Sequence, residues 1–173
     1  MKPVECRDYS RDLIRVLSGL EALYQRLAEL IDQKIDGMRA GNVVEINACT
    51  AREQELVGRI GEQEGLRRVL TDRIARSFGM SPQKARRMTA SQLAERMAQP
   101  WASELLALAG RLQRLTVRIE NRNRMAGRLS GAILEHMDVV LSAMTAPGPG
   151  SGAYGRQGAR LSAGPTRLFE TVG

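Results

Sequence analysis

Residues 101–145 read WASELLALAGRLQRLTVRIENRNRMAGRLSGAILEHMDVVLSAMT and carry the strongest structural signal in the chain. Apolar residues recur in alternating steps of four and three, the spacing of a helix with a narrow apolar seam. The seam consists of Trp101, Leu105, Leu108, Leu112, Leu115, Ile119, Arg122, Ala126, Leu129, Ile133, His136, Val140 and Ala143. Only Arg122 and His136 in it are polar. One helix cannot shield such a seam alone, so it must pack on the rest of the chain, a second copy or another protein.

Two helices are expected before this segment, over about residues 10–39 and 43–78. Each has an apolar seam with polar gaps, at Lys34 in the first and at Glu53, Gln63 and Arg67 in the second. Gly41 favours the turn between them, and Asn42 is a good N-cap whose partner in a capping box would be Glu45. A short turn between two helices of similar length predicts an antiparallel helical hairpin.

The pattern changes between residues 79 and 100, where short helices are expected over 82–99. One would be opened by Pro82, and another would be capped by Thr89 with Gln92 three residues later. Residues 146–173 are rich in glycine and proline, and we expect this tail to be disordered. The predicted fold is therefore all-α: a helical domain over 1–145, built as a coiled-coil-like bundle of a hairpin and a long helix, followed by a flexible tail.

Composition leaves little room for catalysis. Among 173 residues there are one histidine, His136, and two cysteines, Cys6 and Cys49, which are expected to be free thiols. His136 lies on the seam of the long helix, where packing is a better interpretation than general-base chemistry. We therefore predict no enzyme activity, no cofactor and no metal site. No apolar run is long enough for a membrane helix and none resembles a signal peptide, so we expect a cytoplasmic protein without membrane insertion.

The net charge of +7 is not spread evenly. Residues 1–42 and 43–79 each have equal numbers of bases and acids, whereas residues 80–100 have four bases and one acid. The densest group, Lys84, Arg86 and Arg87, could contact phosphates. No aromatic residues interleave with these bases, so a solvated face is the better interpretation and nucleic acid is not the expected partner.

Several short motifs occur in an order and spacing that resemble the FlgN family of flagellar export chaperones. The first turn reads AGN at 40–42, the second helix carries AREQEL at 51–56, the long helix carries NRMAGRL at 123–129, and the tail carries YGRQG at 154–158. The resemblance covers nearly the whole chain. It implies a cytoplasmic chaperone that binds the hook-filament junction proteins, prevents their premature assembly and delivers them to the type III export gate, with the export ATPase as a further partner.

Client binding is expected on the long helix, at Asn123, Leu129, Ile133, Met137, Val140 and Met144. Seam positions with flanking methionines suit a partner helix, because methionine adapts to varied surfaces. Docking at the export gate is expected at Tyr154 and Gly158, which match the tail element of the family. The free protein is expected to be a monomer or a weak dimer. Two alternatives stay open: a structural coiled-coil dimer formed through 101–145, and a basic helical nucleic-acid-binding protein.

Overall fold

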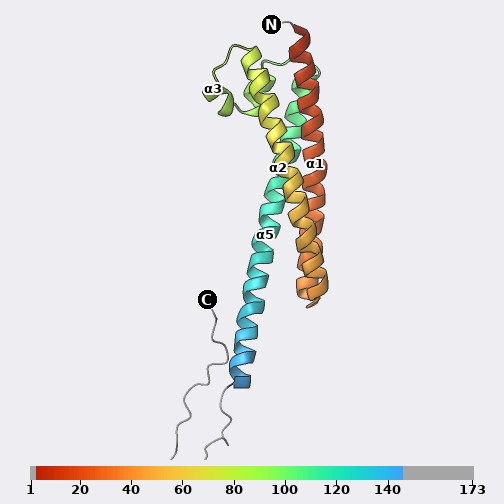
Figure 1. Ribbon diagram of the computed structural model, residues 1–173, viewed down its shortest axis with the longest axis vertical. Helices are drawn as coiled ribbons and strands as arrows, with labels where there is room; N and C mark the ends of the chain where they lie inside the picture. The colour runs from red at the N-terminus through yellow and green to blue at the C-terminus, as the bar shows by residue number, and fades with distance from the viewer. Residues whose placement is uncertain (1–2, 146–173) are drawn as a thin grey trace, which may run out of the picture. The chain divides into compact units, whose positions relative to one another are not determined.

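The computed structural model describes residues 3–145, except for the side chains of residues 3–7, 82, 86 and 145 (Figure 1). The helices are α1 (Pro3–Arg39), α2 (Val43–Ser77), α3 (Pro82–Arg86), α4 (Ala90–Ala94) and α5 (Trp101–Thr145). No strand occurs within residues 3–145, and the predicted all-α class is confirmed. The predicted disordered tail, 146–173, lies outside the described residues. The chain divides after Gly131 into two units, and each is described by itself.

Helix α1 begins at Pro3, several residues before the start near residue 10 that the apolar seam suggested. Proline is well tolerated as the first residue of a helix, because its missing N–H would have no intrahelical partner there. No glycine or second proline follows until Gly19, so nothing in the sequence ends the helix before the seam begins.

The turn between α1 and α2 is fixed by backbone hydrogen bonds at both helix ends. Gly41 has a positive φ of 63°, its N–H donates to the Met38 carbonyl, and the Asn42 N–H donates to the Gly37 carbonyl. This double closure is the Schellman motif. Asn42 then caps α2, its side-chain oxygen accepting from the Glu45 N–H at 3.1 Å. The predicted turn and the Asn42 N-cap are confirmed, whereas the predicted capping box with Glu45 does not form, because the Asn42 N–H donates to the Gly37 carbonyl instead.

Helices α1 and α2 form the predicted antiparallel hairpin (Figure 1). Near the turn, Gly37 lies against Ile46, and at the far end the Arg73 guanidinium stacks over the Tyr9 ring, 5.5 Å from its centroid. Between these ends Lys34 on α1 donates a hydrogen bond to Glu53 on α2. The polar gap of the first predicted seam therefore faces one of the three polar gaps of the second. The hairpin core contains Leu13, Leu17, Leu20, Leu27, Ile31, Ile35, Leu56, Ile60 and Ile74.

The segment between the hairpin and α5 is ordered by its own caps. Ser81 caps α3, which begins at Pro82, and Thr89 forms a complete capping box with Gln92 at the start of α4. Both predicted helix starts are confirmed. The buried side chains of α4, Leu93 among them, belong to the main hydrophobic core, so this segment is attached to the bundle.

Within the first unit α5 runs beside α1 in the same direction. Arg111 on α5 contacts Glu21 on α1 with 2.6 Å between Nε and Oε1, and further along both helices Arg118 and Arg122 contact the two oxygens of Asp32 at 2.9 Å. Arg122, one of the two polar members of the predicted seam, thus has a carboxylate partner. The apolar seam members Leu105, Leu108, Ile119 and Ala126 are buried.

Candidate functional site

The apolar seam continues along α5 beyond the point where its side chains are buried. Ala126 is 5% exposed, and Leu129 and Ile133 are half-buried. Val140 is 43% exposed and Met144 is 77% exposed, although both keep the same seam spacing. The apolar periodicity of the sequence therefore continues along α5, whereas the seam side chains become exposed toward its end.

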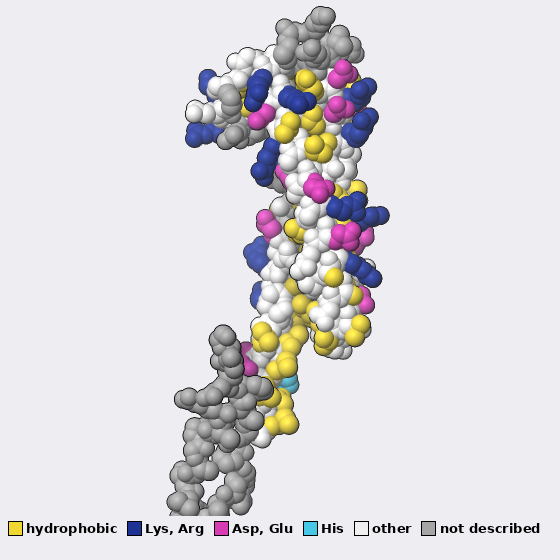
Figure 2. Space-filling model, in the orientation of Figure 1, with side chains coloured by type: hydrophobic (Ala, Val, Ile, Leu, Met, Phe, Trp, Pro, Cys, Tyr) yellow, Lys and Arg dark blue, Asp and Glu magenta, His cyan; other side chains and the backbone are white. Residues whose placement is uncertain are grey.

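Five predicted client residues share one face of α5. Leu129, Ile133, Met137, Val140 and Met144 fall within an arc of about 80° when successive residues of an α-helix turn by about 100°. Hydrophobic side chains gather along this part of the helix in Figure 2. We call these five residues the α5 stripe. Among residues 132–144, Met137, Val140 and Met144 are exposed, and with the half-buried Ile133 they form a continuous apolar surface.

Asn123 is not part of the α5 stripe. It is exposed, and it lies six residues before Leu129, which places it about 120° away around the helix. The predicted docking residues Tyr154 and Gly158 lie outside the described residues. The structure therefore brings five of the six predicted client residues onto one face and separates the sixth from them.

Three further large apolar residues at the end of α5 were missed by the seam analysis. Leu134 is 63% exposed, Val139 is 62% exposed and Leu141 is 55% exposed. They lie beside the stripe rather than on it, so a search for one narrow seam passes over them. A sequence signal does exist: residues 132–145 contain only two charged residues, Glu135 and Asp138, and no lysine or arginine.

The described residues offer no metal site. No group of three or more histidine, cysteine, aspartate or glutamate side chains in this part of the chain could hold a metal ion. His136, expected to be packed on the seam, is exposed instead. None of the described helices is long and apolar enough to span a membrane.

Cys49 is the one buried cysteine among the described side chains, and it is a free thiol. Burial raises its pKa, and its hydrogen bond to the Glu45 carboxylate, 3.6 Å between Sγ and Oε1, adds to the shift. A thiol that stays protonated is a poor nucleophile. The Glu45 side chain is engaged here, whereas a capping box would have it accept from the Asn42 N–H. Cys49 thus behaves as the small apolar residue that its place on the second seam suggested.

Gly127 and Gly131 do not mark a close helix contact within the described chain. A Cβ atom built on either glycine would meet no other heavy atom within 4 Å. Among the described residues, none approaches this part of α5 on the glycine side.

Comparison with known proteins gives one result for nearly the whole chain. The family model described as "FlgN protein" matches residues 9–162. No curated protein and no solved structure matches the chain.

Proposed function

Because the chain belongs to the FlgN family of flagellar export chaperones, we propose that it binds the C-terminal helices of hook-filament junction proteins through the α5 stripe. In this proposal residues 1–145 act as the chaperone domain in the cytoplasm. The observation that carries the proposal is the exposure of the stripe, with Met137 at 53% and Met144 at 77%. A lone helix gains nothing from such a face in water, whereas a client helix laid against it would bury it.

Binding to the α5 stripe would also explain how a chaperone of this kind prevents premature assembly. Helices that assemble with each other do so through apolar faces, and a face covered by α5 is not available to another copy of the client. The two methionines suit this role, because an unbranched and polarisable side chain can repack against more than one client surface.

The experiment is isothermal titration calorimetry of the full chain with the purified C-terminal helices of a junction protein from the same organism. The test variant is Met137→Gln with Met144→Gln, and the control is Glu135→Gln with Asp138→Gln on the polar side of the same turns. Glutamine is a good helix former, and all four side chains are exposed, so both variants should fold. Replacing two methionines that the client would bury should cost about 3 kcal/mol of binding free energy, or about a hundredfold in affinity.

Retained affinity in the methionine variant would disprove binding at the α5 stripe, and no binding by the wild-type chain would disprove the client assignment. Light scattering on the free protein tests the alternative of a structural coiled coil. A tight dimer at all concentrations that the methionine variant dissociates would show that the stripe serves self-association instead. We expect a monomer or a weak dimer.

We further propose that the tail, through Tyr154 and Gly158, docks the loaded chaperone at the export gate, with the export ATPase as an additional contact. A chain truncated after Ala146 should keep its client affinity and lose export of the client in a secretion assay. Tyr154→Ala should reproduce the export defect. Loss of client binding on truncation would instead place the client site in the tail.

A further inference from the structure

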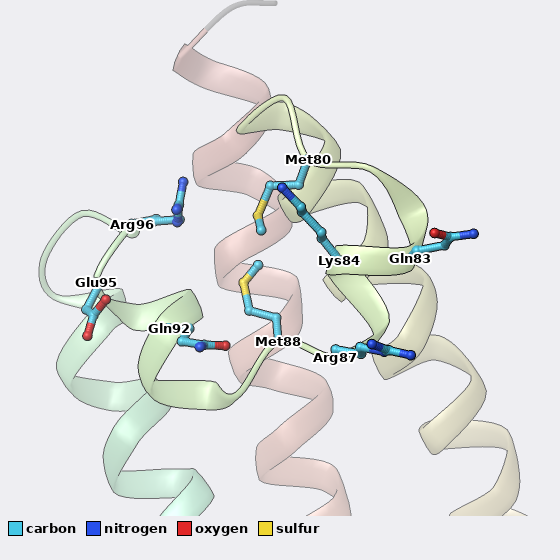
Figure 3. Close-up of a pocket in the computed structure, with 8 residues that line it drawn as sticks. All are labelled: Met80, Gln83, Lys84, Arg87, Met88, Gln92, Glu95 and Arg96. Atoms are coloured by element: carbon cyan, nitrogen blue, oxygen red, sulfur yellow. The ribbon is translucent and has the colours of Figure 1, made fainter.

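A hollow with a volume of about 840 Å³ lies on the segment that joins the hairpin to α5 (Figure 3). Its residues come from α3, α4 and the short stretches beside them. Met80 and Met88 are half-buried, and in Figure 3 their side chains extend toward each other across the hollow. Lys84 and Arg96 lie on opposite sides of this methionine pair.

The backbone around the hollow is held in place by local hydrogen bonds. Gly79 has a positive φ of 73°, and the Met80 N–H donates to the Ala75 carbonyl at 3.1 Å, which closes the end of α2. The capping box of α4 fixes the far side, where the Thr89 N–H donates to the Gln92 side chain at 3.0 Å. A hollow on a fixed backbone costs little ordering entropy when a ligand binds.

The cations around the hollow are not neutralised by the described part of the fold. Lys84, Arg87 and Arg96 are exposed, and none of them forms an ion pair with any described residue. Glu95 is the one carboxylate that lines the hollow, so three cations stand against one acid there. By contrast, Arg111 and Arg118 on α5 each contact a carboxylate of α1. Charges that the fold does not neutralise are available to a ligand, and a concave surface concentrates their field.

We propose that this hollow binds a short acidic segment of a partner protein that inserts an apolar side chain between Met80 and Met88. The carboxylates of such a segment would pair with Lys84 and Arg96 on either side, and Arg87, which points away from the methionines in Figure 3, would add to the attraction. The inference concerns residues outside the α5 stripe, and it holds whether or not the stripe binds a junction protein.

A peptide fits the hollow better than a nucleic acid does. Two thioethers in its centre offer apolar contact, and residues 80–96 contain no aromatic side chain on which a base could stack. The adjoining hairpin has equal numbers of bases and acids in 1–42 and in 43–79, so the positive charge does not continue as a track for a phosphate backbone.

Fluorescence anisotropy with defined probes tests the proposal on the full chain. The first probe is a labelled peptide of glutamates with interspersed leucines, the second has serine in place of leucine, and the third is a single-stranded DNA oligonucleotide. The test variant is Lys84→Glu with Arg96→Glu. The control is Arg59→Glu with Arg114→Glu, which changes the net charge equally at two other exposed arginines.

We expect the glutamate–leucine peptide to bind the wild-type chain, and the test variant to lose affinity by about tenfold or more while the control loses less than about threefold. Met80→Ser should weaken the binding of the glutamate–leucine peptide and leave the affinity for the serine peptide unchanged, because Met80 supplies only apolar contact. The absence of peptide binding, equal losses in both double variants, or tighter binding of the DNA than of the peptide would each overturn the proposal.

Discussion

The Lys34–Glu53 pair provides the sharpest test of how the hairpin is held together. Each side chain is only 15% exposed, and the pair joins α1 to α2 inside the apolar contact. The other carboxylate oxygen, Glu53 Oε1, is buried and accepts no hydrogen bond from any described residue. Lys34 therefore supplies the main compensation for burying this charge.

Lys34→Met keeps most of the aliphatic stem and removes the ammonium, which leaves the Glu53 carboxylate buried without a counter-charge. Breaking a fully buried pair costs about 3–5 kcal/mol, and the residual exposure of this one lowers the expected cost to about 2 kcal/mol. Glu53→Met should cost a similar amount, because it leaves the Lys34 ammonium buried without a counter-charge. The double variant places two methionines in the seam, and its free energy of unfolding should lie within about 1 kcal/mol of that of the wild type.

Urea unfolding followed by circular dichroism measures all four members of this double-mutant cycle. The expected coupling between the two substitutions is about 3–5 kcal/mol. The control cycle uses Asp12 and Arg15, a pair on α1 whose side chains are 41% and 75% exposed, and should show no measurable coupling. A coupling below about 0.5 kcal/mol at Lys34 and Glu53 would refute the reasoning, because it would mean that water solvates the carboxylate in the folded chain.

Two further predictions concern the hairpin. Gly41→Ala should lower the free energy of unfolding by about 1–2 kcal/mol in the same urea assay, because a φ of 63° is strained for alanine. Gly58→Ala inside α2 should instead raise the free energy of unfolding by up to about 1 kcal/mol, because alanine favours the helix and its Cβ meets no other atom there. Equal effects of the two substitutions would contradict the role of Gly41 in the turn. Burial and the bond to Glu45 raise the pKa of Cys49 above that of the unfolded thiol, so this group stabilises the fold below about pH 8.5 and loses that contribution as the pH rises. Iodoacetamide labelling followed by mass spectrometry at pH 8 should therefore be at least about tenfold slower in buffer than in urea, and equal rates would show that the thiol is accessible.

The sequence predicts the helical faces well because periodicity reports directly which side of a helix avoids water. The sequence does not predict which polar residue of one helix contacts which polar residue of another, because that depends on the register between the helices. Lys34 and Glu53 were each visible only as an interruption of a seam, and their contact became apparent from the register that the Gly41 turn sets. In the same way Arg122 interrupts the α5 seam, and its partner Asp32 lies on a different helix.

Local hydrogen-bonding motifs were predictable where a side chain had one good partner. The Thr89 capping box formed as its spacing suggested, because no other group competes for Gln92 within the described contacts. At the start of α2, Asn42 caps as expected while the Glu45 carboxylate accepts from Cys49 one turn later. The hollow on α3 and α4 was visible in the sequence only as a group of bases, because the two methionines between them become neighbours through the turns that the caps fix.

The width of the apolar surface at the end of α5 bears on what covers it. Viewed down the helix axis, the exposed apolar residues span an arc of about 220°, with Val139 at one edge and Leu134 at the other. The α5 stripe lies inside this arc. In a two-stranded coiled coil one partner helix covers a narrow seam, so Leu134 and Val139 would stay in water. A client that presents more than one helix could cover both sides of the stripe. The wide arc therefore favours a client with several C-terminal helices over a simple dimer of this chain.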